Sequence, residues 1–184
     1  MRRRHAWIPA TRHRGLSLVE LLTVLAVVAV LLAMGLPSLQ SFIQSQQISA
    51  VVNDFYAAIS LTRSEAIQRG TRVDLVPQDA DGNWASGWVV FVDENNNQRP
   101  DAGERVIFIH DALQKGTSIR ASLTDSTVQY LAYSGAGRTR TNSSSQRTQF
   151  GTFTFKLNDQ VRKIKLNFLG RPRVCNPARE GTSC

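Results

Sequence analysis

Histidine and cysteine are scarce in this chain. It has three histidines and two cysteines in 184 residues, and only His110 lies beyond residue 15. A Ser-His-Asp arrangement therefore has a single possible base, and the sequence contains no histidine-based metal motif, no Cys-x-x-Cys pair and no phosphate-binding P-loop. These absences argue against an enzyme and against a bound cofactor. We expect His110 to be a surface or packing residue.

The chain also has only one long apolar run. Residues 16–36 form a run of 21 residues that a single charge, Glu20, interrupts. As a helix this run measures about 31 Å, which is enough to cross a hydrocarbon core. Five arginines precede it and favour a cytoplasmic leader: Arg2, Arg3, Arg4, Arg12 and Arg14. A carboxylate in such a helix is costly and marks Glu20 as a functional candidate; the alternative is a hydrated position near the interface.

The junction between the basic segment and the apolar run resembles the processing signal of type IV prepilins and pseudopilins. The matching features are the arginines, Gly15 directly before the run, and Glu20 at its fifth position. The resemblance implies that prepilin peptidase cleaves between Gly15 and Leu16 and methylates the new N-terminus. It also implies that Glu20 pairs, in a filament, with the Leu16 ammonium of a neighbouring subunit, which relieves two poorly solvated charges. Pro37, residue 22 counted from Leu16, matches a proline of the family.

Two other interpretations of the N-terminus are a secretory signal peptide and a plain membrane anchor. A secretory signal has an apolar region of about 7–15 residues and then a small-residue cleavage site. The run here is longer, and no clear Ala-x-Ala site follows it. We therefore expect a single-pass precursor in the bacterial inner membrane, with its globular part in the periplasm. Assembly with other pilins would then carry it into a pilus or pseudopilus and, in a pilus, to the cell surface.

The helical pattern continues beyond the apolar run. Pro37 is expected to end or kink the run, as Gly35 before it permits. Apolar residues then recur on one helix face: Ile48, Val52, Phe55, Ile59 and Ala66. Because Arg69-Gly70 has the composition of a helix end, we expect one helix over residues 16–69. Its second half would pack on a sheet; a partner-binding groove is the alternative use of the apolar face.

From residue 71 the apolar period changes to two, which predicts strands. The expected strands are residues 72–76, 87–92, 105–110, 118–122, 128–133, 148–156 and 161–168. A turn is expected at residues 158–160 and a mobile, Ser/Thr/Gln-rich loop at 138–149. The fold class is therefore α+β, with a long N-terminal helix packed on an antiparallel sheet, and Trp84 and Trp88 as core or loop anchors. The expected segments are residues 1–15 (leader), 16–36 (membrane and assembly helix), 37–70 (amphipathic continuation) and 71–184 (β-rich domain).

Two further segments carry a family resemblance. The strand Gly87-Trp88-Val89-Val90-Phe91-Val92-Asp93 and the polar residues after it are similar to the GspH/FimT group of minor pilins and pseudopilins. Ser64-Glu65-Ala66, near the expected end of the helix, is similar to the same group. The resemblance covers most of the chain after Gly15 and implies a type IV pilin-like fold.

Oxygen-bearing side chains after this strand have the spacing of a calcium loop. They occupy positions 1, 3, 5, 9 and 12 of such a loop: Asp93, Asn95, Asn97, Asp101 and Glu104. Position 6 is Gln98, where these loops need glycine, and no helices are expected beside the segment. We therefore expect a polar hairpin loop closed by Asx turns rather than a metal site.

Negative and positive charges are separated along the chain. Residues 16–111 contain 5 basic and 11 acidic residues, a net charge of −6, whereas residues 112–184 contain 12 basic and 3 acidic residues, a net charge of +9. Such an asymmetry within one small domain suggests an acidic partner such as nucleic acid. The alternatives are a solvated basic face, or one that meets an acidic neighbouring subunit.

The last predicted strand and the tail concentrate the basic residues. Alternation along the strand buries Ile164, Leu166 and Phe168 and exposes Lys163, Lys165 and Asn167. Gly170 permits a tight bend, and Pro172 then stiffens the chain between two arginines whose forks suit phosphate oxygens. An even cysteine pair in a periplasmic domain is most simply a disulfide, which we expect between Cys175 and Cys184.

The tail sequence Gly-Arg-x-Arg at residues 170–173 resembles the DNA-binding motif of FimT-type minor pilins in naturally competent bacteria. The resemblance implies that Arg171 and Arg173 contact the phosphates of double-stranded DNA, without sequence preference, during DNA uptake. From charge alone, three further cations are expected to widen this patch: Lys163, Lys165 and Arg179. A second Gly-Arg-x-Arg, at residues 137–140, lies in an expected loop, and the resemblance does not extend to it.

The function expected from the sequence is that of a minor pilin that binds double-stranded DNA in natural transformation. One alternative is a FimU-like structural minor pilin that primes pilus assembly. The other is a GspH-type minor pseudopilin of a type II protein secretion system. All three imply the same fold and the same leader cleavage.

Overall fold

The structure, a computed structural model, describes residues 17–126 and 128–184, except for the side chains of residues 34–37. The chain divides into two compact units, Met1–Ser41 and Phe42–Cys184. Among the residues that the structure describes, every buried core residue belongs to the second unit, so this core is built without any described residue before Phe42.

Helix α1 spans Leu18–Arg69. Its N-terminus is capped by Ser17, whose Oγ accepts a hydrogen bond of 3.1 Å from the backbone N–H of Glu20. It ends at Arg69, and Gly70 directly after it adopts the left-handed φ of +65° typical of the residue that follows a helix. The expected helix end is thus confirmed, and the helix continues through Pro37 rather than ending there. By length and composition α1 qualifies as a membrane-crossing helix near the N-terminus.

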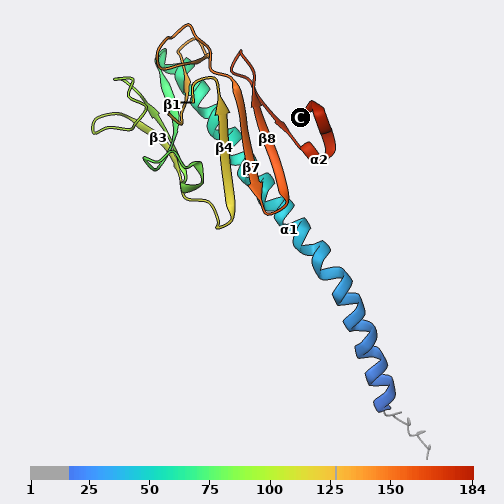
Figure 1. Cartoon of the computed structure of the whole chain (residues 1–184). Coiled ribbons are helices and arrows are strands. Elements are labelled where there is room, and N and C mark those ends of the chain that lie inside the picture. The colour runs from blue at the N-terminus through green and yellow to red at the C-terminus, as the bar shows by residue number, and fades with distance from the viewer. Residues whose placement is uncertain (1–16, 127) are drawn as a thin grey trace, which may run out of the picture. The chain divides into compact units, whose positions relative to one another are not determined.

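Antiparallel strands form two sheets beside α1 (Figure 1). The first sheet has the order β3 (Val106–His110), β2 (Trp88–Val92), β1 (Val73–Pro77), β5 (Leu131–Tyr133) and β6 (Thr139–Arg140). The second has the order β4 (Thr117–Leu123), β7 (Gly151–Leu157), β8 (Gln160–Leu166) and β9 (Pro172–Cys175). Three short helices complete the described chain: η1 (Trp84–Ser86), α2 (Pro177–Glu180) and η2 (Gly181–Ser183).

The core lies between the second half of α1 and both sheets. The five predicted core residues of the helix face are all at most 1% exposed, which confirms the apolar stripe: Ile48, Val52, Phe55, Ile59 and Ala66. Trp84 and Trp88 are buried, as expected of core anchors. Phe55 packs edge-on against both tryptophans, with ring centroids 5.3 and 5.0 Å away. The α+β class and the helix-on-sheet arrangement are therefore confirmed.

The β-rich domain differs from the sequence prediction in three places. The segment 138–149 is mostly a loop, as expected, but it contains the two-residue strand β6, and buried Gln149 donates from Nε2 to the carbonyl of Tyr130 at 3.1 Å. The tail after Gly170 contains a strand, β9, that was not expected. Phe168 was expected to face the core but is 63% exposed, because β8 ends at Leu166 and the chain then turns.

A buried arginine joins β1 to two loops. Arg72, which is 5% exposed, donates from Nε and Nη2 to both carboxylate oxygens of Asp74, at 2.7 and 2.6 Å. Its Nη2 also lies 3.1 Å from Asp93. The third nitrogen, Nη1, donates to the side-chain oxygens of Asn96 and Asn142 at 2.8 and 2.7 Å. One guanidinium thereby engages two buried acidic side chains and fixes the loops that follow β2 and β6.

The loop after β2 is the polar, Asx-closed loop expected from its sequence. The side-chain oxygen of Asn95 accepts from the backbone of Asn97 at 3.0 Å, and that of Asn97 accepts from Arg99 at 2.8 Å. Gln98 takes a left-handed φ of +62° and donates its backbone N–H to Asp93 at 3.1 Å. The first carboxylate of the calcium-like spacing thus serves the loop backbone and the ion pair with Arg72.

The Asp74 carboxyl gives the fold a pH dependence. Burial raises the pKa of Asp74 to about 7 despite the hydrogen bonds from Arg72, whereas in an unfolded chain it is about 3.9. The folded protein thus retains a proton that the unfolded chain releases. This contribution to stability is complete below about pH 4 and is lost as the pH rises through about 7.

We expect the unfolding free energy of the Phe42–Cys184 unit to fall by about 2–3 kcal/mol between pH 5 and pH 8 because of this group. Urea unfolding at both pH values measures it. Asp74→Asn should remove this fall, since the amide does not ionise, whereas Asp81→Asn, at an exposed position, should keep it. Parallel pH profiles for wild type and Asp74→Asn would contradict the assignment.

Candidate functional site

The tail begins with a turn that is fastened to the first sheet. The side-chain oxygen of Asn167 accepts the backbone N–H of Arg171 at 2.9 Å, and Gly170 adopts a φ of +72°. The hydroxyl of buried Tyr133 donates to the carbonyl of Gly170 at 2.5 Å. A Cβ at Gly170 would lie 2.9 Å from the Tyr133 ring, so glycine is required both by φ and by space. The predicted bend is confirmed, and it fixes the point from which the two arginines leave.

Strand β9 follows the turn and forms the edge of the second sheet. Pro172 occupies its first position, where the missing N–H is tolerated on an edge strand. In the antiparallel register with β8, Arg173 lies opposite Lys165 and Cys175 lies opposite Lys163. The pairing with β8 fixes where Arg173 of the Gly-Arg-x-Arg motif lies relative to Lys165.

Register places the basic side chains on the outer face of this sheet. Ile164 and Leu166 are 0% and 3% exposed, so the residues that alternate with them point away from the core, as predicted. One outward row pairs Thr152, Lys165 and Arg173 across β7, β8 and β9. Phe150, Asn167 and Arg171 are the residues directly beyond the last paired positions of the three strands, Gly151, Leu166 and Pro172.

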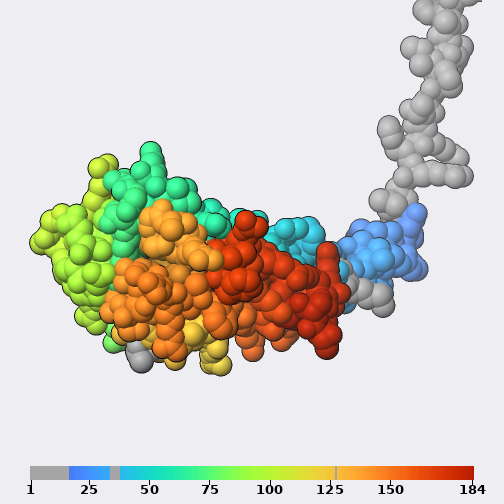
Figure 2. Space-filling view, turned by 90° about the horizontal axis from the view of Figure 1, so that it is seen from above, coloured from blue at the N-terminus to red at the C-terminus, as the bar shows by residue number. Residues whose placement is uncertain are grey.

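The paired row and the residues beyond it line one shallow groove of about 450 Å³, which we call the tail groove. Its lining residues are Phe150, Gly151, Thr152, Lys165, Leu166, Asn167, Arg171 and Arg173. In Figure 2 the red tail and the orange segment before it form one continuous surface. Three of the five predicted cations therefore meet in one place.

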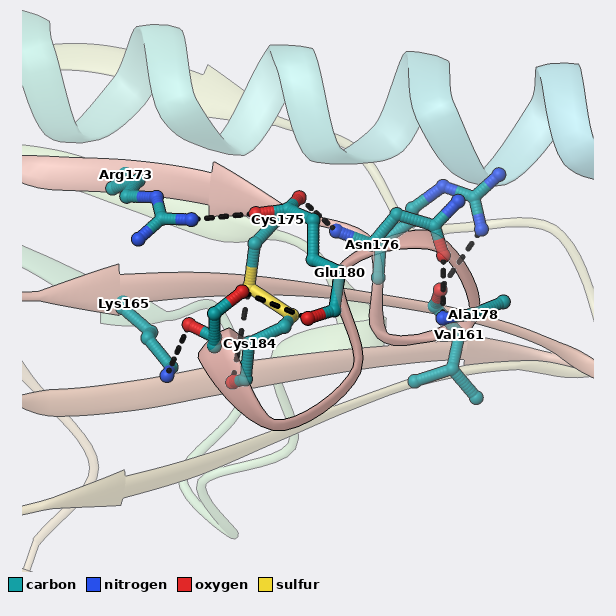
Figure 3. The surroundings of a disulfide bond; sticks show 10 residues. Val161, Lys165, Arg173, Cys175, Asn176, Ala178, Glu180 and Cys184 are labelled. Carbon is teal, nitrogen blue, oxygen red and sulfur yellow. Dashed lines mark hydrogen bonds and ion pairs between the residues drawn. A yellow bond between two sulfur atoms is a disulfide. The ribbon is translucent and has the colours of Figure 1, made fainter.

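The C-terminal residues hold two of these cations (Figure 3). Arg173 donates from Nη2 to Glu180 at 2.5 Å, and Lys165 donates from Nζ to the carbonyl of Ser183 at 3.2 Å. The side chain of Arg173 is still 59% exposed. A hydrogen bond from the backbone of Asn176, helped by the charges of Arg173 and Lys165, lowers the pKa of Glu180. Glu180 therefore positions Arg173 and at the same time opposes an incoming anion.

The predicted disulfide between Cys175 and Cys184 is confirmed, with Cα atoms 5.7 Å apart and both residues buried. It folds the last residues back over the end of β9, as Figure 3 shows. Helix α2 lies within the closed loop and is capped by Asn176, whose side chain accepts from Ala178 at 3.1 Å. Strand β9 is thus fastened at both ends, by the disulfide and by the bond from Tyr133 to Gly170.

The other two predicted cations lie outside the tail groove. Lys163 is on the same outer face, two residues along β8 from Lys165. Arg179 lines a different, polar groove of about 460 Å³, together with Arg162. Arg162 points toward the helix, where its Nη2 donates to Ser45 Oγ at 2.8 Å. Only Lys163 is therefore placed to extend the basic surface of the tail groove.

The second Gly-Arg-x-Arg has a different arrangement. Arg138 is exposed, but Thr139 is 1% exposed and Arg140 is half-buried. Burial, with Arg72 nearby, lowers the pKa of Arg140. His110, the remaining candidate base, stacks on buried Trp88 with ring centroids 3.9 Å apart, which confirms a packing role.

The N-terminal site residues are only partly described. Gly15 and Leu16 lie outside the described residues, so cleavage and methylation there remain predictions. Glu20 lies in the exposed first turn of α1, and the backbone at Pro37 is helical. The role expected for Glu20, a pair with a neighbouring subunit, is likewise still a prediction.

Sequence comparison finds two matching family models and a curated relative. Residues 51–170 match the model described as type II transport protein GspH, and residues 10–36 match the prokaryotic N-terminal methylation motif. The pilin-like protein PilA1 of Thermus thermophilus is 36% identical over 91 residues, which cover 50% of this chain and 55% of the relative. The chain thus spans about half the length of that relative.

Solved structures with the same fold include two bacterial proteins. The type IV minor pilin FimU of Pseudomonas aeruginosa aligns with a TM-score of 0.58 at 16% identity, over 75% of this chain and 95% of FimU. The minor pseudopilin EpsH of the Vibrio cholerae type 2 secretion system aligns with a TM-score of 0.52 at 14% identity, over 72% of this chain and 99% of EpsH. At these identities the likeness is one of fold.

Removing the disulfide should loosen the tail more than the rest of the domain. For a Cys175→Ser/Cys184→Ser variant we expect a loss of about 2–3 kcal/mol in unfolding free energy, since the closed loop is short. Hydrogen exchange should show a larger loss of protection in β9 than in β7. Reduction of the wild-type disulfide should reproduce both effects, and an equal loss of protection in the two strands would contradict a local role.

Proposed function

Because the chain belongs to the GspH family of type IV minor pilins and pseudopilins, we propose that it is a minor pilin whose tail groove binds double-stranded DNA during DNA uptake. The observation that carries the proposal is the convergence of Arg171, Arg173 and Lys165 on one exposed groove. Guanidinium forks suit phosphate oxygens, and contacts to phosphates carry no base sequence. The binding is therefore independent of sequence and sensitive to salt.

Rigidity supports this use of the groove. Binding loses affinity when flexible side chains and loops must be ordered. Here β9 is fastened at one end by the disulfide and at the other by Tyr133, so much of that ordering is complete before DNA arrives. The net charge of +9 over residues 112–184 adds a field that draws a polyanion toward this half of the domain.

The N-terminal helix supplies assembly in the same proposal. Members of the family work with other pilins and are processed by prepilin peptidase. In this chain we place cleavage between Gly15 and Leu16, followed by methylation of Leu16. Glu20 then pairs with the Leu16 ammonium of a neighbouring subunit, and α1 passes from the inner membrane into the filament with the globular unit on the periplasmic side.

The family description favours a second candidate, a minor pseudopilin of a type II secretion system, since the matching model is that of a type II transport protein. The fold shared with FimU suits a structural minor pilin equally. Neither role needs DNA binding. Substitution of the tail arginines, Arg171 and Arg173, therefore tests DNA capture against both of these roles.

For duplex DNA and the Phe42–Cys184 unit, about four phosphate contacts predict a slope of log affinity against log salt near −3.6. Arg171→Gln/Arg173→Gln should reduce the slope to about −1.8 and weaken binding at low salt by at least tenfold. Fluorescence anisotropy with a labelled duplex measures both. Arg99→Gln/Arg105→Gln, which removes the same charge from exposed positions in the acidic half, is the matched control. No binding at low salt, or equal losses in both variants, would sink DNA capture by the tail groove.

Removing the carboxylate beside Arg173 should have the opposite effect. Glu180→Gln keeps an oxygen to accept the N–H of Asn176 but removes the charge that competes with phosphate for Arg173. We expect duplex affinity at low salt to rise about two- to fivefold. Glu94→Gln makes the same change in net charge at an exposed site and should have little effect. A lower affinity for Glu180→Gln would show that positioning by Glu180 outweighs its repulsion of DNA.

A further inference from the structure

The tail groove contains an aromatic side chain that phosphate binding does not use. Phe150 lines the groove and is 48% exposed, so it contributes little to the core. A single exposed apolar residue is ordinary on a protein surface. Phe150, however, lines the same groove as Arg171, Lys165 and Arg173. An exposed ring in one groove with three cations suits a ligand that has both an aromatic face and negative charge.

The backbone holds Phe150 firmly although its ring faces solvent. Its carbonyl accepts from the backbone N–H of Thr124 at 2.9 Å, and its own N–H donates to Thr124 Oγ1 at 3.2 Å. The next residue, Gly151, has a φ of +149°, and a Cβ there would lie 2.1 Å from the carbonyl oxygen of Ser122. The backbone at Phe150 is thus held against the end of β4, which fixes the point from which the ring enters the groove.

Ring and cations together match one class of ligand. Base-paired DNA presents phosphates to a protein, but the faces of its bases are covered by their neighbours. In a single strand the base faces are open and stack on aromatic side chains, while arginine and lysine follow the backbone. An acidic protein surface would use the cations and leave the ring without a partner.

We propose that the tail groove takes a single-stranded stretch of DNA, with a base stacked on Phe150 and the backbone phosphates on Arg171, Arg173 and Lys165. The proposal rests on the proposed DNA binding of the same groove and narrows its ligand. Duplex DNA engages the cations alone. A single strand, such as a frayed end, engages the cations and the ring, and therefore binds more tightly for the same number of phosphates.

The test compares three probes of equal phosphate number with the Phe42–Cys184 unit, alongside the full chain in detergent micelles. The probes are an oligothymidine of about 12 nucleotides, the same oligomer without bases, and a duplex whose two ends are closed by non-nucleotide linkers. We expect wild type to bind oligothymidine about tenfold more tightly than the abasic oligomer, since stacking of one base contributes a factor of this order. Phe150→Leu should remove that difference and leave the abasic affinity unchanged.

The controls separate this inference from the proposed function. Phe108→Leu alters another partly exposed ring, on β3 of the first sheet, and should change no affinity. Arg171→Gln/Arg173→Gln should weaken all three probes. If the duplex binds but oligothymidine and the abasic oligomer bind equally, duplex capture stands and the stacking site is refuted. If oligothymidine binding depends on Phe150 while the duplex does not bind, the stacking site stands and duplex capture fails.

Competition with an acidic peptide tests whether the groove binds an acidic protein instead of DNA. A polyglutamate peptide with the charge of the oligomer should displace the abasic oligomer readily and oligothymidine about tenfold less well, because it offers no face to Phe150. Equal displacement of both oligomers, or a loss of polyglutamate affinity in Phe150→Leu, would overturn the proposal. Urea unfolding of each variant checks that its fold is intact.

Discussion

The packing of one ring, Phe55, aligns every layer of the globular unit. It extends from α1 to Trp88 in the first sheet and to Phe153 and Phe155 in the second, whose ring centroids lie 4.9 and 5.3 Å away. Because side chains alternate along a strand, the inward position of Phe153 and Phe155 forces the intervening and flanking residues of β7 outward. A shift of one residue in the pairing of β7 would turn its outward side chains toward the core. The outward position of the basic residues thus depends on the buried aromatic contacts of Phe55, on the other face of the sheet.

Much of the fold could be predicted from the sequence because its elements carry their own periodicity. The helix face of α1, the strand β2 and the alternation of β8 follow from local patterns. Strand β9 could not be found this way, since Arg171-Pro172-Arg173 has the composition of a turn and its pairing with β8 is set by a distant sheet edge. The exposed Phe168 was misplaced because alternation was continued beyond the residue where Asn167 turns the chain. Phe150 carries no sequence signal, since only the tertiary fold brings it into the same groove as Arg171.

The arginines of this protein carry the same charge but differ in how many of their hydrogen-bond donors are already used within the fold. Arg72 has all of its donors committed to two carboxylates and two amides in the interior, so it serves as a structural counter-ion. Arg173 has one strong partner, Glu180, and keeps most of its surface in solvent. A count of positive residues treats the two alike. The fold separates them, because burial commits the first and an edge strand presents the second.

The disulfide between Cys175 and Cys184 makes the structure of the tail depend on the compartment in which the chain is found. Disulfides persist in oxidising compartments, whereas the cytoplasm keeps thiols reduced. On the proposed route the chain is made in the cytoplasm, and there its C-terminal residues, including Glu180 and Ser183, are not yet fastened over β9. On that route the tie between the C-terminal residues and the end of β9 forms only after the globular unit has left the cell interior. Export is thereby also the step at which the tail takes its final, disulfide-closed form.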